Sequence, residues 1–307
     1  MTAPSSPGPG RALLALVGYP LILAQAIAFA IWLDRNGFAA GAIVGYTSLV
    51  TIALVTLSER LIPFRPDWNQ NQGDFRADML HNIFSAYLMR ELCKAVLRAL
   101  LASGVIAIAA SQDGGVWSGL AEQWPFALQV VLVLVIAEFT DYWMHRISHE
   151  VEFFWRFHAL HHSPLRLYWL NAGRDHPGET LLFYLSTSVP LVLLGTPPKV
   201  LLMFYVIESA LGLLQHANAA FRLGPLNWIF STADLHRWHH SLIVAEANSN
   251  YGSNLIIWDT VFGTRTLPHL GGPDRIGVET PYITNRWRDQ LMVPFRWRRL
   301  VTKAPGA

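Results

Sequence analysis

The sequence predicts an all-α fold: an integral membrane helical bundle with about four transmembrane helices and a cytoplasmic histidine-rich cap. Three observations support this fold class. The 307-residue chain is 52% hydrophobic and only 14% charged, whereas a soluble domain carries about 25% charged residues. It contains several long uncharged runs, and ten of its twelve histidines lie between positions 145 and 240. The composition therefore indicates a membrane protein, and the histidines indicate a metal site.

Two apolar runs near the N-terminus predict a transmembrane hairpin. The runs Ala12–Leu33 and Phe38–Leu57 contain no charged residue. At a rise of about 1.5 Å per residue, each can cross roughly 30 Å of hydrocarbon. A cleaved signal peptide is the alternative for the first run, but that run is too long and has no small-x-small cleavage site before Asp34.

The next two spans are predicted at Asn82–Ala110 and at Pro125–Phe139, the latter running directly into the first histidine cluster. Charges in the first half of the third span suggest that this half lies in the interface or faces protein: Arg90, Glu91, Lys94 and Arg98. The later apolar stretches Leu181–Leu194 and Val200–Leu214 are short and interrupted by proline and glycine. We interpret them as a re-entrant or interfacial pair, with a fifth and sixth span as the alternative.

The arginines between the spans predict the orientation. Arg11, Arg60, Arg65 and Arg76 lie on one side of the predicted bundle, and only Arg35 lies in the loops on the other side. The positive-inside rule then places the N-terminus and the long C-terminal part in the cytoplasm. The predicted organisation is a disordered tail (1–11), N-terminal transmembrane helices (12–124), a histidine-bearing domain (125–266) and a C-terminal tail of loop and short helix (267–307).

Three histidine clusters carry the predicted chemistry. They read His145-Arg-Ile-Ser-His149, His158-Ala-Leu-His161-His162 and His236-Arg-Trp-His239-His240. On a helix, residues three and four apart share a face, so each cluster should present a stripe of imidazoles. Eight imidazoles are too many for one metal ion and suit two. Because Cys93 is the only cysteine, nitrogen and oxygen must supply the ligands.

Three further histidines have less certain roles. His216 follows an apolar helix, and a ninth ligand is as plausible there as a structural role. For His176, fixing a loop is favoured over a role beside the metal or the substrate. His81, one turn after Asp78, is more plausibly structural than part of the site.

Two carboxylates precede His145 on the predicted fourth helix, Glu138 by two turns and Asp141 by one. Carboxylates near a membrane interior are costly and usually functional. Asp141 is positioned to orient His145 through the second ring nitrogen, as metal-bound histidines commonly require. An equally plausible alternative is an ion pair of these carboxylates with one of three arginines: Arg146, Arg156 or Arg174.

The order HRxxH, HxxHH and a later HxxHH beside membrane spans resembles the fatty acid hydroxylase/sterol desaturase superfamily. The resemblance covers roughly Phe126–Thr266. It includes Arg-Asp-His-Pro-Gly-Glu (174–179), Gln-His-Ala-Asn (215–218) and the closing Asn-Tyr-Gly (250–252), Trp-Asp (258–259) and Phe-Gly-Thr (262–264). Asn248 departs from the aspartate that is common in the family, and Gly178 from a larger apolar residue. Neither is expected to touch a histidine.

The resemblance implies a membrane-bound oxidoreductase with a diiron centre that hydroxylates or desaturates an unactivated C–H bond of a lipid. Two iron ions and O2 would be required, and electrons would come from a separate reductase, ferredoxin or cytochrome. The implied metal ligands are His145, His149, His158, His161, His162, His216, His236, His239 and His240. The candidates for supporting them or for contacting substrate are Glu138, Asp141, His176, Asn218, Asn250 and Asp259. No catalytic residue is expected beyond the metal centre.

Two other functions remain as alternatives. A zinc-dependent membrane hydrolase needs a general-base glutamate as in HExxH; here Arg146 follows His145, although Glu150 follows His149. A non-catalytic metal transporter or haem-binding bundle is the other, but adjacent histidines such as His161-His162 do not suit bis-imidazole haem ligation. Nucleic acid is not an expected partner, because the net charge is only +2 and no basic, aromatic-interleaved stripe is present.

Overall fold

The computed structural model describes residues 8–102, 123–279 and 283–302. In these ranges the chain is helical, with isolated β-bridges and no strand, which confirms the all-α prediction. The six long helices are α1 (Pro9–Arg35), α2 (Ala40–Leu61), α4 (Met89–Ala102), α7 (Phe126–Glu150), α9 (Pro177–Leu193) and α10 (Pro198–His216). The shorter ones are η1 (Pro66–Asn69), α3 (Phe75–His81), η2 (Asn82–Leu88), α8 (Glu152–His162), η3 (Trp169–Gly173), η4 (Gly224–Trp228), α11 (Ala233–His239), α12 (Val244–Ala247), α13 (Ile257–Phe262), α14 (Trp287–Leu291) and α15 (Val293–Val301).

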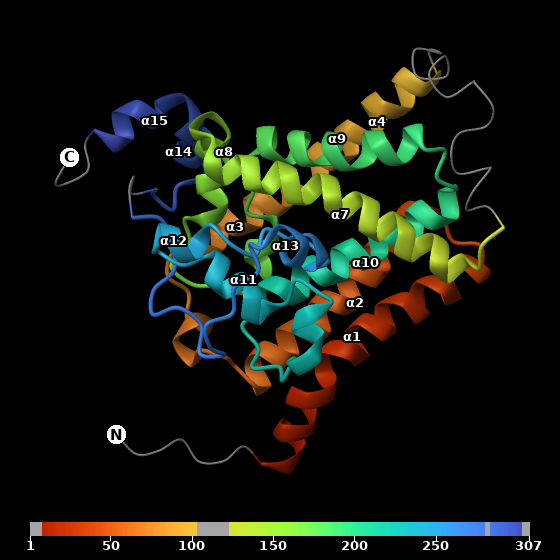
Figure 1. Ribbon diagram of the computed structural model, residues 1–307, viewed down its shortest axis with the longest axis horizontal. Coiled ribbons are helices and arrows are strands. Elements are labelled where there is room, and N and C mark those ends of the chain that lie inside the picture. The colour runs from red at the N-terminus through yellow and green to blue at the C-terminus, as the bar shows by residue number, and fades with distance from the viewer. Residues whose placement is uncertain (1–7, 103–122, 280–282, 303–307) are drawn as a thin grey trace.

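The long helices run back and forth between two ends of the molecule. Figure 1 shows the α1–α2 turn, the α9–α10 turn and the start of α7 at the right-hand end. The short helices α3, α8, α11, α12, α14 and α15 gather at the left-hand end (Figure 1). We call this second end the cap. Three of the helices that bear histidine, α7, α8 and α10, end at the cap side of the bundle.

Four of the described helices are long and apolar enough to cross a membrane: α1, α2, α7 and α10. The first two match the predicted hairpin, and α7 continues without a break from its apolar part through His149. Of the predicted third span, Asn82–Ala110, the structure describes η2 and the 14-residue, amphipathic α4; residues 103–110 lie outside the described residues. The fourth candidate is α10, for which the sequence favours a re-entrant or interfacial helix and leaves a full span as the alternative.

The interruptions seen in the sequence of residues 181–214 mark a turn and not broken helices. Pro190 lies inside α9, which continues to Leu193. The chain then turns at Gly195, whose φ of 74° favours glycine. Pro197 precedes α10 and Pro198 is its first residue, where a missing N–H costs nothing. These residues therefore separate α9 from a full-length α10.

The main core surrounds α10, which packs against α1, α2, α7 and η3. On α1 the buried positions Ala15, Ile22, Ala26 and Ala30 recur at helical spacing, and small side chains of this kind let membrane helices approach closely. This core joins residues of the predicted segments 12–124 and 125–266 in one hydrophobic cluster. The positions of α7 and α10, and with them of their histidines, are thus fixed by the bundle.

A second, smaller core attaches the C-terminal helix to the cap. Trp297 and Val293 of α15 pack against Ala159 and Leu160 of α8. The predicted C-terminal loop and short helix thus include α14 and α15, which cover the outer face of α8. The inner face of α8 carries three histidines.

Candidate metal centre

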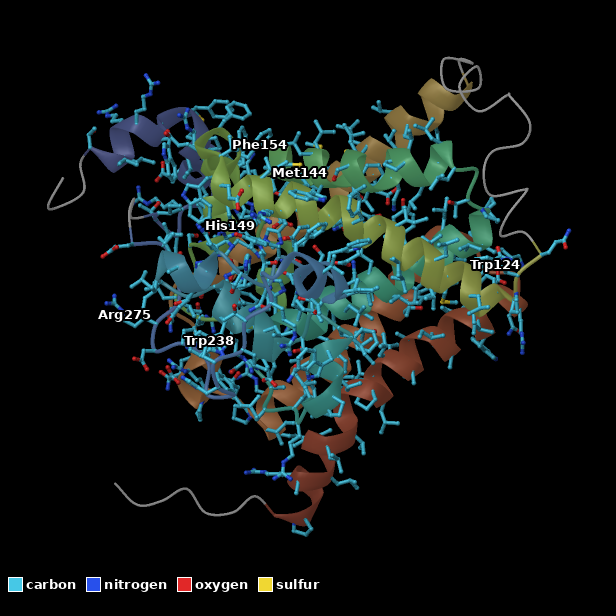
Figure 2. All side chains as sticks on the ribbon, viewed as in Figure 1. Trp124, Met144, His149, Phe154, Trp238 and Arg275 are labelled. Atoms are coloured by element: carbon cyan, nitrogen blue, oxygen red, sulfur yellow. The ribbon has the colours of Figure 1, made fainter. Side chains whose placement is uncertain are left out.

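Nine histidines meet at the cap end of the bundle in two adjacent groups. The five-histidine group contains His145, His149, His158, His162 and His239, and the four-histidine group contains His161, His216, His236 and His240. Within each group, one nitrogen of every ring lies within 4.8 Å of the others. Figure 2 shows His149 at the cap end, on the opposite side of the molecule from Trp124, which precedes α7. These nine are the residues that the sequence predicts as ligands, His216 included.

The helices divide each histidine cluster between the two groups. Residues four apart stay together, as His158 and His162 do on α8, because four residues make about one turn. His161 lies about 100° around the helix from its neighbour His162 and enters the other group. His239 and His240 separate in the same way. Each HxxHH motif therefore contributes histidines to both groups.

The inner ring nitrogens of each group converge on one another. In the five-histidine group, the Nε2 atom of His158 lies 3.0 Å from the Nε2 atoms of both His145 and His162. In the four-histidine group, the Nε2 atom of His236 lies 2.9 Å from the Nε2 atoms of His216 and His240. The Nε2 atoms of His161 and His216 are 3.3 Å apart.

The outer ring nitrogens show which of these inner atoms are unprotonated. His145 donates from Nδ1 to the carbonyl of Tyr251 at 2.6 Å, and His239 donates to the carbonyl of Ser249 at 2.8 Å. His216 likewise donates to the carbonyl of Gly212 at 3.0 Å. Since a carbonyl can only accept, Nδ1 carries the proton and each Nε2 presents a lone pair to the centre.

Facing lone pairs repel each other unless a cation lies between them, so the donor set fits a metal ion in each group. The Nε2 atoms of His149 and His239 are buried and have no hydrogen-bond partner among the described residues, as expected for atoms that bind a metal ion. Burial, with a further contribution from neighbouring imidazoles, lowers the pKa of His158, His162, His236, His239 and His240 well below 6.5. Neutral imidazole is the form that binds metals.

The segment Arg-Asp-His-Pro-Gly-Glu (174–179) supports both groups from outside. Glu179 accepts a hydrogen bond from Nδ1 of His158, and Asp175 accepts one from Nδ1 of His161 at 3.0 Å. Arg174, fully buried, anchors the segment through a 2.6 Å contact with the equally buried Asp78. Carboxylates behind metal-bound histidines fix the ring orientation and raise its basicity.

His176 fixes the loop, which is the role that the sequence favours. Its ring caps α9 by accepting a hydrogen bond from the backbone N–H of Gly178 and donates to the carbonyl of Leu291 at 3.1 Å. His81 lies outside both groups and contacts Ser85 and Gln290.

Asp141 has neither of the two roles expected from the sequence, which are to orient His145 or to pair with one of three arginines. His145 donates to the Tyr251 carbonyl and not to Asp141, which accepts the hydroxyl hydrogen bond of Thr187. Ion pairs with the three arginines are absent as well, because Arg146, Arg156 and Arg174 pair with Glu150, Glu152 and Asp78. Glu138 accepts from the backbone N–H groups of Ser253 and Asn254 at 2.5 and 2.9 Å. Both carboxylates are buried on α7 without touching a metal group.

The closing Asn-Tyr-Gly and Trp-Asp segments build the loop behind the five-histidine group. Asp259 accepts from the backbone N–H groups of Tyr251 and Gly252, both at 2.8 Å. Asn250 adopts a φ of 53° and donates to the carbonyls of Leu235 and Thr266. The loop thereby directs the Tyr251 carbonyl at His145. Asn218 instead ties the chain to the Arg65 backbone, away from both groups.

Both departures from the family pattern touch a histidine, contrary to the expectation. Asn248 accepts a hydrogen bond from Nδ1 of His149 at 3.2 Å, and Gly178 lies against His176. Sequence reasoning also assigned no role to Asp175, Glu179 or the Ser249 carbonyl. Asp175 and Glu179 are separated by 14 and 21 residues from the histidines they contact, a distance at which no helical spacing rule applies.

Comparison with known proteins places these features in a family. The sequence profile described as "Fatty acid hydroxylase" matches residues 130–264. The ornithine lipid hydroxylase OlsE of Rhizobium tropici is 41% identical over 80% of this chain and 74% of its own length. Similarity also extends to the alkylglycerol monooxygenase of Homo sapiens, 35% identical over 41% of this chain and 28% of its own length. The methylsterol monooxygenase 2-2 of Arabidopsis thaliana is 29% identical over 44% of this chain and 52% of its own length.

No solved structure matches the chain. The chain spans about half or less of the two monooxygenases, but about three quarters of the hydroxylase. The relatives are named as hydroxylases and monooxygenases, so the expected oxidoreductase activity is confirmed, and the apolar helices fit a membrane enzyme. On the strength of the profile match and the 41% identity to a hydroxylase of similar length, this chain belongs to the fatty acid hydroxylase family.

Proposed function

We propose that the nine histidines hold two iron ions and that the protein hydroxylates or desaturates a C–H bond of a membrane lipid with O2. The observation that carries this proposal is the pair of adjacent groups in which unprotonated Nε2 atoms face one another. Two sites of neutral nitrogen donors suit iron. The relative named ornithine lipid hydroxylase makes ornithine lipids the first substrate class to assay.

Bound iron would supply the oxidising power that an unactivated C–H bond requires and that no acid or base of the chain provides. The side chains around it keep the site dry and rigid. Eight of the nine histidines are buried, and His149 is half-buried. Three rings are held in orientation by hydrogen bonds from Nδ1 to backbone carbonyls: His145 to Tyr251, His239 to Ser249 and His216 to Gly212. Asp175 and Glu179 raise the basicity of the two rings they contact.

Phe183 of α9 marks the side from which a lipid chain would reach the centre. Its ring centroid lies 5.9 Å from that of His145 and 6.3 Å from that of His158. An apolar ring beside the ligands favours a hydrocarbon segment over water. The further residues of α9 that face outward are exposed leucines, Leu181 and Leu185. This arrangement supports lateral entry of the substrate from the bilayer.

The zinc hydrolase alternative finds no general base in the place that the sequence suggested. The Glu150 carboxylate forms an exposed ion pair with Arg146 at 2.8 Å and belongs to neither histidine group. Metal analysis of the purified protein distinguishes the two proposals. Two irons per chain would support the oxygenase proposal. Bound zinc together with hydrolysis of a lipid ester would overturn that proposal in favour of the hydrolase.

We further propose that the protein crosses the membrane several times and that the cap lies in the cytoplasm. A separate electron-donor protein would dock on the cap beside α15. Residues 286–299 contain five exposed arginines and one acidic residue, Asp289. Among the described residues none of these arginines forms an ion pair, so the surface suits an acidic protein. This surface covers α8, whose opposite face bears His158, His161 and His162. Electrons arriving there would cross about one helix diameter, roughly 10 Å.

The donor proposal is tested with reduced plant-type ferredoxin, an acidic one-electron donor. Replacing Arg298 and Arg299 together by glutamate should raise the KM for ferredoxin and remove the decline of the rate with ionic strength. Unchanged KM and salt dependence would contradict docking at α15. Loss of binding to anionic vesicles with unchanged electron transfer would assign the surface to the membrane instead.

The function itself is tested by comparing lipid extracts of cells with and without the protein. Wild-type protein should yield a lipid with one additional oxygen atom, or with two hydrogens fewer, only when O2 is present. His161→Ala should abolish that product while membrane insertion, followed by protease protection of tagged loops, is unchanged. Normal turnover in this variant would contradict the diiron assignment.

A further inference from the structure

Aromatic rings that can lose an electron border one histidine group and not the other. The ring of Tyr251 lies against three rings of the five-histidine group, at centroid distances of 5.8 Å from His145, 5.4 Å from His149 and 5.9 Å from His239. Trp155 lies 5.2 Å from His149 as well. Among the described residues, the ring contacts of the four-histidine group are with other histidines only.

Two further rings lead from Tyr251 to the surface. The ring of Tyr142 on α7 is fully buried and lies 5.8 Å from that of Tyr251, and the ring of Trp143 lies 5.5 Å from that of Tyr142. Trp143 is 36% exposed, and the Arg146 guanidinium lies over its ring at 5.6 Å. Arg146 also pairs with the exposed Glu150, so Trp143 meets a polar surface that water-soluble molecules reach. We call Tyr251, Tyr142 and Trp143 the aromatic path.

The hydroxyl group of Tyr142 has a route by which it can lose its proton. It accepts a hydrogen bond from Arg146 at 3.2 Å and lies 3.1 Å from the Thr264 hydroxyl, which donates to Asp259 at 2.7 Å. Because the Thr264 hydrogen is directed at Asp259, the Tyr142 hydroxyl donates to Thr264. Burial raises the pKa of the Asp259 carboxyl, which makes this carboxylate a better proton acceptor. Since a phenol is oxidised far more easily when its proton leaves with the electron, Tyr142 is suited to donate an electron.

The proposed chemistry creates a need for such a path. The oxidising power that breaks a C–H bond of a lipid also suffices to oxidise a histidine ring, and histidines surround the centre whether or not a lipid is bound. An electron from the protein removes this oxidising power before a ligand is damaged. On the side proposed for lipid entry the ring beside the histidines is Phe183, which resists oxidation. The oxidisable rings of the aromatic path thus offer an outlet that the substrate side lacks.

We propose that Tyr251, Tyr142 and Trp143 discharge the metal centre when O2 reacts there without a bound lipid, and that Tyr142 carries the resulting radical. This inference goes beyond the proposed function and rests on it, because the oxidising equivalents come from O2 at that centre. It assigns to the protein a second, protective redox activity, whose electron source is a soluble thiol.

Each passage moves one electron inward and leaves the path unchanged. Tyr142 loses an electron to the centre through the Tyr251 ring, and its phenolic proton passes to Thr264 as the Thr264 proton passes to Asp259. Trp143 then returns an electron to Tyr142, and the proton comes back along the same route. The oxidised indole takes an electron from the thiol, which releases a proton and becomes a thiyl radical. Two thiyl radicals join as a disulfide, so two passages oxidise two thiols and reduce the centre by two electrons.

Electron paramagnetic resonance detects the radical directly. Reduced, iron-loaded protein in detergent is mixed with O2 without lipid and frozen, and we expect a tyrosyl radical that Tyr142→Phe abolishes. Thr264→Val should lower its yield at least about threefold, because valine cannot accept the proton. Tyr205→Phe is the matched control: Tyr205 also has a hydrogen-bonded hydroxyl but contacts no histidine ring, so the yield should not change. A radical that persists in Tyr142→Phe, or that Trp155→Phe abolishes instead, would overturn the proposal.

Damage to the ligands gives a second measurement. After repeated cycles of reduction and exposure to O2 without lipid, mass spectrometry counts the oxygen atoms added to the peptides that carry His145, His149 and His239. Tyr142→Phe and Trp143→Phe should both accumulate more of these adducts than wild type, and Tyr205→Phe should match wild type. Equal damage in wild type and in both path variants would contradict a protective role.

Zinc-loaded protein separates failure of this proposal from failure of the proposed function, because zinc has no redox chemistry. Under light, a water-soluble ruthenium photo-oxidant takes an electron from the exposed Trp143, and the oxidation should move inward to Tyr142. The difference between the spectra of wild type and Tyr142→Phe should then contain a tyrosyl radical that Trp143→Phe also lacks. If the proposed function fails, iron-loaded protein consumes no O2 while this photochemical radical remains. Absence of the photochemical radical from wild-type protein would overturn the aromatic path itself.

Discussion

The five-histidine and four-histidine groups differ in what supports the imidazoles from behind. Four of the five rings in the first group donate from Nδ1 to a partner, namely Tyr251, Asn248, Glu179 and Ser249. In the second group only His161 and His216 do so, while Nδ1 of His236 and of His240 is buried without a partner among the described residues. Ring orientation is thus better fixed in the first group. We expect that group to bind its metal more tightly.

The sharpest way to test this difference uses two adjacent residues that serve different groups. His240→Ala leaves three nitrogens in the four-histidine group, whereas His239→Ala leaves four in the other. His240→Ala should retain about one metal per chain and lose all activity, because the four-histidine group, whose rings are less well fixed, is left with three nitrogens. His239→Ala should retain nearly two metals with reduced activity. Metal analysis after desalting measures both, and equal losses in the two variants would contradict the asymmetry.

The next largest effect is expected for the carboxylate behind the weaker group. Asp175→Asn removes the charge from the hydrogen bond to His161 and should lower metal affinity in the four-histidine group by about 10–100-fold. Asn248→Ala removes only a neutral partner of His149 and should lower affinity in the other group by less than about tenfold. Competition with a fluorescent chelator measures each affinity. A larger effect at Asn248 than at Asp175 would reverse the proposed roles.

A smaller effect is expected at Asp259, which touches no histidine. Its carboxylate accepts from two backbone N–H groups and from the hydroxyl of Thr264. Asp259→Asn can accept fewer of these bonds, which should lower the free energy of unfolding by about 1–3 kcal/mol. The substitution should also let the Tyr251 carbonyl move, and it should therefore lower the metal affinity of the five-histidine group only. Thermal unfolding and metal analysis check the two effects, and weakening of the four-histidine group would contradict this account.

The smallest effect on the centre is expected for His81, which belongs to neither group. Burial lowers the pKa of His81 to about 4, against an ordinary value of 6.5. Below pH 6.5 the unfolded chain takes up a proton that the folded protein refuses, so stability is lost as the pH falls from 6.5 towards 4. The loss should reach about 1–3 kcal/mol.

The stability of His81→Gln should accordingly depend less on pH over this interval, because glutamine does not titrate. Unfolding in detergent at pH 7 and pH 4.5 compares the two proteins, and the difference between them removes any effect of acid on the histidine groups. Identical pH dependence in wild type and variant would contradict a buried neutral His81.

The sequence predicts the residues of the centre far better than their pairing. Short helical spacings identify eight histidines, since these spacings depend on local geometry alone. The assignment of His161 and His162 to different groups depends on how α8 is turned against α7 and α11, which is a tertiary property. Asp175, Glu179 and the Tyr251 carbonyl come from loops whose approach to the histidines no local pattern encodes. For the same reason the sequence predicts for Asp141 a role that the Tyr251 carbonyl fulfils.

The helices, like the histidines, are predicted well where local sequence decides and less well where tertiary contacts decide. Uncharged runs predict α1, α2 and the apolar part of α7 because hydropathy depends on composition. The charges of α4 indicate a helix that faces protein or the interface, and Arg90 and Lys94 do face Glu208 and Tyr205. The full length of α10 is harder to predict, because this helix is enclosed by four other elements. The proline and glycine residues before α10 look like interruptions in the sequence, yet they form the turn that starts this helix.

Anaerobic titration of metal-free protein with ferrous iron, followed by Mössbauer spectroscopy, tests the central claim most directly. We predict saturation at two irons per chain, with the first equivalent entering the five-histidine group and a second, distinct site filling afterwards. In His240→Ala the titration should stop after the first equivalent. Saturation of the wild-type protein at one iron, or a failure to bind iron while zinc binds tightly, would contradict the account.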